Sequence, residues 1–385
     1  MFNLSDYAGR GYNFLHNHLF PKSKRLSSLM IYATDLCDSG CKHCLIWAKR
    51  PVTYLPLETI KKIMASHCVS SGTMVGLEGG EFLLHPQADE ILKWFAENHP
   101  NYDLFSNCLR PLKLIEAVKK YKPHRLYISL DGDKETYQYM RGKDGYGSVI
   151  KVIEELKDIV PVFVMFTLSP YNDYNDLEHV AEICETYKVF LRVGIYNNIP
   201  FFDTIDDSRE VMFGQLKNQH VLTYREAVEL RDTKVVREKE SDAEVLINKK
   251  QIPDIIKRFS ENYDYVKLYQ NWATGNLRLK CNSILDSVIV LPNGDVPICQ
   301  YLDLKLGNIY NNTLDEIFNS EKSTATQKHY SENCNQCWVS YHRKYDIILY
   351  RNFERFFGRW ATSKMLGYYK WDEDESLTYK GVVEG

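Results

Sequence analysis

The fold of this chain is decided by one stretch near its beginning, LSSLMIYATDLCDSGCKHCLIW, residues 26–47. An apolar run ending at Thr34 predicts a buried β-strand, and the loop after it carries Cys37, Cys41 and Cys44 in a C-x3-C-x2-C arrangement. Three thiolates on a short loop can hold three irons of a cubane cluster and leave the fourth iron open. The same spacing also fits a structural zinc ion, with His43 or a distant residue as the fourth ligand.

Short apolar runs alternate with amphipathic helices from this stretch to about residue 200. Further strands are predicted in TMVGLE (73–78) and at four positions that begin near residues 102, 125, 161 and 190. Helices are predicted over residues 57–68, 88–99, 149–159 and 176–187. Repeated strand–helix units build a parallel sheet, and six of them predict a partial (β/α)6 TIM barrel. Loops after the strands meet at one rim, where barrel enzymes collect their catalytic groups.

Composition excludes several classes of protein. The chain has 385 residues, 44% hydrophobic and 26% charged, with a formal net charge of −3, which argues against a nucleic-acid binder. Its beginning, MFNLSDYAGRGYNF, is not a signal peptide, and no apolar run reaches the roughly eighteen residues of a membrane span. We therefore expect a cytoplasmic protein without a transmembrane segment. In that compartment its 10 cysteines indicate metal ligands or thiols rather than disulfides.

A second group of cysteines follows in the last third of the chain. Cys281 and Cys299 flank a predicted hairpin, SVIVLPNGDVPICQ (287–300), and Cys334 and Cys337 form a C-x2-C pair. Four thiolates can fully ligate a [4Fe–4S] cluster or a structural zinc ion.

Three motifs in register with the first cysteines carry a resemblance to a known family. Glu78-Gly79-Gly80-Glu81 closes the second strand and is followed by FLLHP, Ser106-Asn107-Cys108 closes the third, and ISLDG (128–132) precedes Arg141-Gly142. In this order they resemble the radical S-adenosylmethionine (SAM) superfamily. The C-terminal cysteines, with LGNI (306–309) and a helix over TLDEIF (313–318) between them, resemble its SPASM/Twitch domains, in the shorter Twitch form with one auxiliary cluster.

The resemblance implies the cofactors and their ligands. Two [4Fe–4S] clusters are expected, one that chelates SAM and one auxiliary. The expected iron ligands are Cys37, Cys41, Cys44, Cys281, Cys299, Cys334 and Cys337, and the expected SAM contacts are Gly79, Gly80, Glu81, Asn107, Ser129 and Arg141. Arg141 could instead be an ordinary surface arginine. Phe82 and Cys108 depart from the family pattern, which usually has proline and glycine there.

The resemblance also implies the reaction class. Electron transfer from the reduced cluster cleaves SAM to a 5′-deoxyadenosyl radical, which abstracts a hydrogen atom from the substrate. An external reductant such as flavodoxin or ferredoxin is expected. Family members with auxiliary clusters modify peptides by oxidation, cross-linking or epimerisation, or they oxidise or rearrange sugars, aminocyclitols and other small alcohols, some of which could be lipid-linked. Peptide modification is slightly favoured, although only about 25 residues precede the first strand, too few for a peptide-recognition domain.

Five regions are expected along the chain. They are an N-terminal extension (1–25), the partial barrel (26–215), a helical linker (216–275), a small α+β Twitch/SPASM-like iron–sulfur domain (276–340) and an aromatic, basic tail (341–385). The sequence identifies no general base.

Overall fold

The computed structural model describes residues 4–169, 171–196, 253–273, 277–302, 304–335 and 337–369. Its centre is a seven-stranded parallel sheet in the order β6-β5-β4-β3-β2-β1-β8. The strands are β1 (Ser28–Thr34), β2 (Met74–Gly79), β3 (Tyr102–Ser106), β4 (Arg125–Ser129), β5 (Val162–Leu168), β6 (Phe190–Ile195) and β8 (Ser287–Val290). The predicted partial barrel is confirmed.

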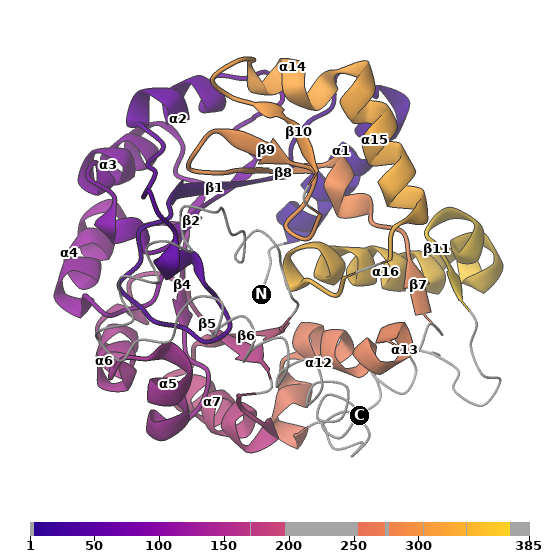
Figure 1. Ribbon diagram of the computed structural model, residues 1–385. Coiled ribbons are helices and arrows are strands. Elements are labelled where there is room, and N and C mark those ends of the chain that lie inside the picture. Colours follow the sequence, from indigo (N-terminus) through magenta and orange to yellow (C-terminus); the bar gives the residue numbers. More distant parts are fainter. Residues whose placement is uncertain are drawn as a thin grey trace.

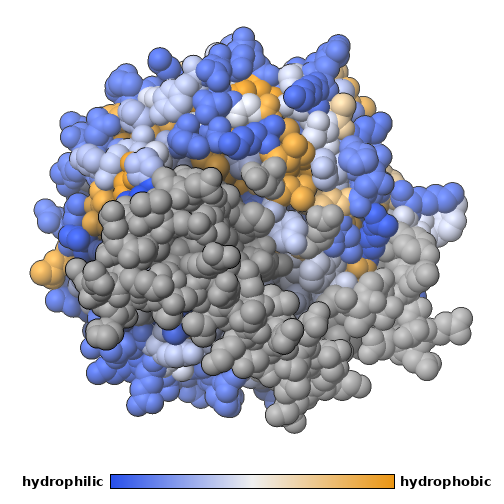
Figure 2. Space-filling model, in the orientation of Figure 1, coloured by the Kyte–Doolittle hydropathy of each residue, from blue (hydrophilic) through white to orange (hydrophobic). Residues whose placement is uncertain are grey.

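Helices connect the first six strands and cover the outside of the sheet (Figure 1). They are α2 (Leu57–Met64), α3 (Ala88–Asn98), α4 (Pro111–Tyr121), α5 (Lys134–Arg141), α6 (Tyr146–Leu156) and α7 (Tyr174–Tyr187). Each buries an apolar stripe at helical spacing, for example Leu114, Ile115 and Val118 of α4. The outer face of the sheet is therefore covered by helices, as is usual for a parallel sheet. On the face of the molecule in Figure 2, hydrophilic residues dominate the outer rim.

The interior of the half-barrel is filled by aromatic side chains. Phe105, Tyr127 and Phe163 stack across β3, β4 and β5, with ring centroids 4.6 Å and 4.9 Å apart. Stacked rings fill this space densely, because each buries a large apolar area. The polar groups at the carboxyl ends of the strands thus lie above an apolar floor.

The seventh strand corrects the predicted hairpin over residues 287–300. β8 pairs in parallel with β1, in the register Ser28↔Ser287, whereas β9 (Asp295–Pro297) pairs with β10 (Lys305–Asn308). The tight turn itself exists, because Gly294 N donates to Leu291 O and Leu291 N donates to Asp295 O, both at 2.9 Å. The free edge of β1 would otherwise expose a row of backbone groups, and β8 pairs with it.

The remaining elements surround the C-terminal cysteines and occupy the side of the ring between β1 and β6 (Figure 1). They include β7 (Leu277–Leu279), η6 (Asn282–Leu285), α14 (Leu314–Asn319), α15 (Glu321–Asn333), α16 (Ser340–Met365) and β11 (Gly367–Tyr369), with α12 (Ser260–Lys267) and α13 (Tyr269–Ala273) beside them. Helix α1 (Leu4–Leu19) precedes the barrel, and the short helices η1 (Ile46–Ala48), η2 (Phe82–Leu84) and η5 (Asp254–Arg258) complete the described elements. Most of the predicted linker, up to residue 252, lies outside the described residues, as do 370–385 of the tail.

The described part of the predicted tail is not one uniform surface segment. The first half of α16 is core, with Arg343, Ile347 and Tyr350 buried, whereas Phe356 and Trp360 in the second half are more than 70% exposed. The break lies at Gly358, whose φ of 76° interrupts the helix. Among the described residues no helix is long and apolar enough to cross a membrane.

Candidate functional site

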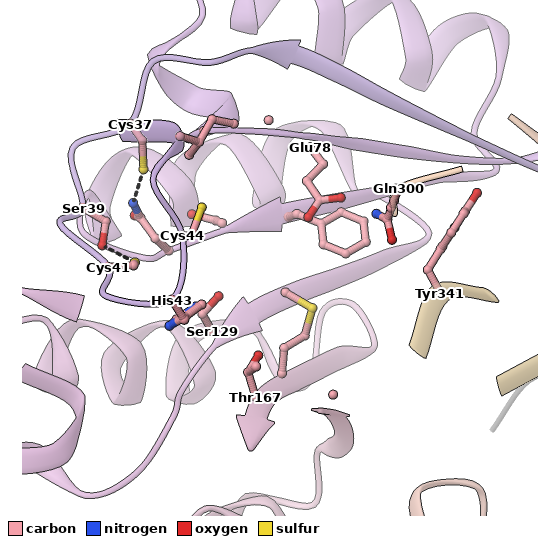
Figure 3. Close-up of a pocket in the computed structure, with 18 of the residues that line it drawn as sticks. Cys37, Ser39, Cys41, His43, Cys44, Glu78, Ser129, Thr167, Gln300 and Tyr341 are labelled. Atoms are coloured by element: carbon pink, nitrogen blue, oxygen red, sulfur yellow. Dashed lines mark hydrogen bonds between the residues drawn. The ribbon is translucent and has the colours of Figure 1, made fainter. Parts of the chain in front are cut away.

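A cavity of about 270 Å³ opens at the carboxyl ends of the strands. Side chains from β1 to β6 and from the C-terminal region line it, and Figure 3 shows the first cysteine group at one end and Glu78, Gln300 and Tyr341 at the other. Of the predicted site residues, the cavity brings together Cys37, Cys41, Cys44, Gly79, Gly80, Asn107, Ser129 and Arg141. Residues separated by a hundred positions in the sequence thus share one site.

The cysteine loop is held from two sides by backbone hydrogen bonds. On one side Gly80 N donates to Thr34 O at 2.7 Å, and Glu81 N donates to Leu36 O at 2.8 Å. On the other side Gly40 N donates to Arg141 O, at 2.9 Å, at the end of α5. A loop fixed at both flanks presents its thiols at defined positions, as ligation of a cluster requires.

The two glycines at the end of β2, which are predicted SAM contacts, are required by the packing of the cysteine loop. In the structure a Cβ on Gly79 would lie 2.2 Å from Thr34 O, and a Cβ on Gly80 would lie 2.3 Å from Leu36 O. The glycines therefore let β2 approach the cysteine loop, and Gly79 also has a φ of 149° that side chains disfavour.

Glu81 lies beneath the cavity rather than in its lining. Its side chain is buried and accepts hydrogen bonds from Ser106 Oγ at 3.1 Å and from Asn107 N at 2.8 Å. Burial raises the pKa of Glu81 to about 7. These contacts join the ends of β2 and β3, so Glu81 acts here by positioning Asn107.

Polar side chains surround the first thiols. Arg141 is buried, not on the surface; its Nε donates to Asp131 Oδ2 at 2.7 Å, and its Nη1 points to Cys41 Sγ at 3.7 Å. Ser39 Oγ is 3.0 Å from the same sulfur, and Asn107 Nδ2 is 3.8 Å from Cys37 Sγ. Donors aimed at sulfur stabilise thiolates, the form that binds metal. Burial raises the pKa of Cys37 to about 12, so its thiolate needs an adjacent cation.

Cys108, one of the two departures from the family pattern, is a packed thiol. It is fully buried and does not belong to the cavity lining. Its φ of 61° is left-handed, the conformation for which glycine is best suited. Thr167, near the end of β5, also lines the cavity, whereas Ser169 does not.

The second cysteine group lines a small space of about 10 Å³, formed by Cys281, Cys299, Cys334 and Cys337 with neighbouring side chains. Leu302 N donates to Cys299 Sγ at 3.3 Å, which again supplies a donor to a thiolate. The indole of Trp338 is fully buried and stacks on Tyr265, with centroids 5.6 Å apart. This packing anchors the segment that carries Cys337.

His342 and Arg343 of α16 complete the wall of this second site. Arg343 is fully buried and donates to Cys337 O at 3.0 Å and to Leu279 O at 2.9 Å. Burial lowers its pKa, but the nearby cysteines Cys281 and Cys337 reverse that shift, so the pKa is raised. A permanent cation is thus held against four thiols, where it offsets the negative charge of a thiolate-ligated cluster.

Neither cysteine group has the arrangement of a mononuclear site. In the described ranges no three His, Cys, Asp or Glu side chains are gathered as ligands of one metal ion. A cubane binds each cysteine to a different iron. The donor sets, four thiols around one small space and three thiols beside a larger cavity, fit such clusters.

Comparison with known families agrees with this geometry. Residues 31–184 match the radical SAM superfamily, and residues 281–338 match an iron–sulfur cluster-binding domain named SPASM. The chain is a radical SAM protein with a SPASM domain. The radical SAM domain binds SAM and a [4Fe–4S] cluster, and the SPASM domain binds auxiliary iron–sulfur clusters.

Solved structures share this radical SAM fold. SuiB from Streptococcus suis, bound to S-adenosylmethionine, is 14% identical, with a TM-score of 0.54 over 86% of this chain and 75% of SuiB. SuiB bound to its precursor peptide SuiA gives 15% identity and a TM-score of 0.54 over 89% of this chain and 76% of SuiB. Native anSMEcpe bound to AdoMet and the Cp18Cys peptide is 16% identical, with a TM-score of 0.49 over 88% of this chain and 99% of anSMEcpe. No protein with a curated description matches the chain.

Sequence reasoning missed several residues at the far end of the radical SAM cavity. Glu78 was named only as the first residue of the motif that closes β2, and Arg192, Gln300 and Tyr341 were not identified, yet all four line the cavity. Two of them adjoin recognised motifs, since Glu78 precedes the glycine pair and Gln300 follows Cys299. That adjacency was the available signal.

Proposed function

We propose that this radical SAM protein cleaves SAM reductively, abstracts a hydrogen atom from a peptide substrate and completes the modification with the help of one auxiliary [4Fe–4S] cluster. When bound, the open cluster supplies the electron that cleaves SAM. The chain's own residues position the ligand and the substrate around that chemistry.

The observation that carries this proposal is the shared cavity. Three thiols lie at one end, and residues of the cluster-binding C-terminal region, such as Gln300 and Tyr341, lie at the other. A substrate between them would reach both SAM and the side of the second cluster. The predicted SAM contacts fit this division, because Ser129, Asn107 and Arg141 lie with the first cysteine group rather than with Gln300.

One auxiliary cluster is proposed because four cysteines line a single small space. Cys281, Cys299, Cys334 and Cys337 provide all four ligands, and full thiolate ligation favours an electron-transfer role over binding of substrate. This is the shorter, Twitch-like form of the domain.

A peptide substrate is favoured by the likeness to SuiB, which binds a precursor peptide. Flavodoxin or ferredoxin is proposed as the reductant.

The test is anaerobic reconstitution followed by an assay of reductant-dependent 5′-deoxyadenosine. About eight irons per chain and SAM cleavage are expected. Candidate precursor peptides encoded near the gene are then incubated with the enzyme, and their mass should change. Sugars and aminocyclitols are tested in parallel as alternative substrates. Absence of SAM cleavage in iron-replete protein would refute the radical chemistry, and turnover of a sugar alone would refute the peptide.

A further inference from the structure

The far end of the cavity contains a carboxylate with a defined hydrogen-bonded partner. Glu78, at the end of β2, is the one Asp or Glu among the described residues that line the cavity. It is half-buried, so a ligand can reach it. Figure 3 shows its carboxylate directed into the cavity beside Gln300. An acidic group in this place can accept a proton from whatever occupies the cavity.

A chain of hydrogen bonds joins this carboxylate to the second cysteine group. Tyr32 hydrogen-bonds to Glu78, and Gln300 Nε2 donates to Tyr32 Oη at 2.8 Å. Because Tyr32 accepts from Gln300, its own hydroxyl proton is free to be donated to Glu78. Gln300 directly follows Cys299, and its backbone N–H donates to His342 Nε2 at 3.4 Å. Glu78 is therefore linked through two side chains to the wall of the auxiliary site.

The protonation of Glu78 is suited to transfer near neutral pH. Loss of hydration raises the pKa of Glu78 to about 7, although Arg192 and the Tyr32 hydrogen bond act in the opposite direction. A base whose pKa lies near the working pH combines availability with driving force.

The charged and titratable groups that face Glu78 do not titrate in this range. Burial raises the pKa values of Tyr32 on β1 and Tyr341 on α16. Burial lowers the pKa of Arg192 on β6, but neighbouring Tyr127, Tyr345 and Glu78 reverse this, so Arg192 stays protonated. Burial also lowers the pKa of His342 to about 3.

We propose that Glu78 accepts the substrate proton in a two-electron oxidation, and that Tyr32 and Gln300 position it against the auxiliary cluster. This inference rests on the proposed function and specifies the reaction as the oxidation of a carbon–heteroatom single bond to a double bond. The substrate carbon carries a protic heteroatom, such as a hydroxyl or thiol. Its C–H hydrogen atom leaves to the deoxyadenosyl radical, and the O–H or S–H proton leaves to Glu78. The remaining electron passes to the oxidised auxiliary cluster, and a carbon–heteroatom double bond forms.

The test measures proton–electron coupling without a substrate. The full chain with Cys37, Cys41 and Cys44 replaced by alanine should hold the auxiliary cluster alone, and its midpoint potential is measured by EPR from about pH 6 to about pH 8.5. Above the pKa of Glu78 the carboxylate disfavours an added electron, so the potential should fall as the pH rises. In the same background Glu78→Gln should abolish this fall, whereas the exposed Glu97→Gln should leave it intact.

A second variant keeps the inference testable if Glu78→Gln fails to fold. Tyr32→Phe removes a hydrogen bond that lowers the pKa of Glu78, so the fall in potential should move to higher pH. A potential that does not depend on pH, or a dependence that survives Glu78→Gln, would overturn the inference. SAM cleavage is assayed separately in the wild type and in Glu78→Gln, both with all cysteines intact. If neither protein cleaves SAM, the proposed function is refuted, and this result is distinct from a failure of the Glu78 inference.

Discussion

The two cysteine sites differ in how the chain assembles them and in how open they are. The first is one loop of eight residues, Cys37 to Cys44, beside a cavity of about 270 Å³. The second draws on cysteines from 281 to 337, and the space they enclose is about 10 Å³. A site beside a large cavity can admit a chelating ligand such as SAM, whereas a space of about 10 Å³ has no room for one, which leaves electron exchange as its role. The same ligand type thus supports two roles, and access separates them.

Removing a cysteine from either site should have the largest effect, because it should abolish one cluster and leave the other. Cys41→Ala should leave about four of about eight irons and abolish 5′-deoxyadenosine formation. Cys299→Ala should also leave about four irons but retain reductant-dependent SAM cleavage. Iron analysis and product quantification check both. Cys184→Ala, a buried thiol of α7 outside both groups, is the control and should keep all the iron; loss of SAM cleavage in Cys299→Ala would contradict the division of roles.

Replacing the buried Arg343 should damage only the second cysteine site. Arg343→Met removes a buried cation that forms an ion pair with the buried Asp346 at 3.6 Å, and loss of one partner of a buried charge pair typically destabilises by about 3–5 kcal/mol. Denaturant unfolding measures this free energy, and iron analysis should show loss from the auxiliary site. The exposed Arg355→Met on the same helix should change stability by less than about 0.5 kcal/mol. Equal effects of the two variants would show that burial of Arg343 is unimportant.

The open site should be sensitive to the glycines that hold its loop. Gly79→Ala would place a Cβ 2.2 Å from Thr34 O, so the loop must shift, and we expect a loss of about 2–3 kcal/mol together with reduced occupancy of the first cluster. Thermal unfolding and iron content report the two effects. Gly147→Ala on α6 meets nothing within 4 Å, and it should change stability by no more than about 1 kcal/mol. A Gly79→Ala protein with full SAM cleavage would exclude the close approach as a requirement.

The smallest expected difference is kinetic. Cys299→Ala keeps only the cluster at the first cysteine group, and Cys41→Ala keeps only the auxiliary cluster. In air the first of these clusters should lose iron several-fold faster, because solvent and oxygen reach it through the cavity. SAM should slow this loss, since a ligand stabilises the state that it binds. Time courses of iron release measure both rates, and identical rates with no effect of SAM would mean that the two sites are equally accessible.

The sequence by itself determined the parts of this protein that depend on local pattern. β3 and β4 begin at Tyr102 and Arg125, where the apolar runs placed them, because strand and helix periodicities are properties of neighbouring residues. The cysteine spacings and the order of the motifs likewise identified the radical SAM and SPASM domains before any contact was known.

Only the tertiary structure decided which distant residues meet. It placed β8 beside β1 instead of β9, assigned the glycine pair to the cysteine loop, and buried Arg343 of an apparently basic tail against four thiols. It also joined Glu78 to Gln300 through Tyr32, across more than two hundred residues. Such contacts depend on how edges and charges are satisfied once the chain has collapsed, which no local pattern records.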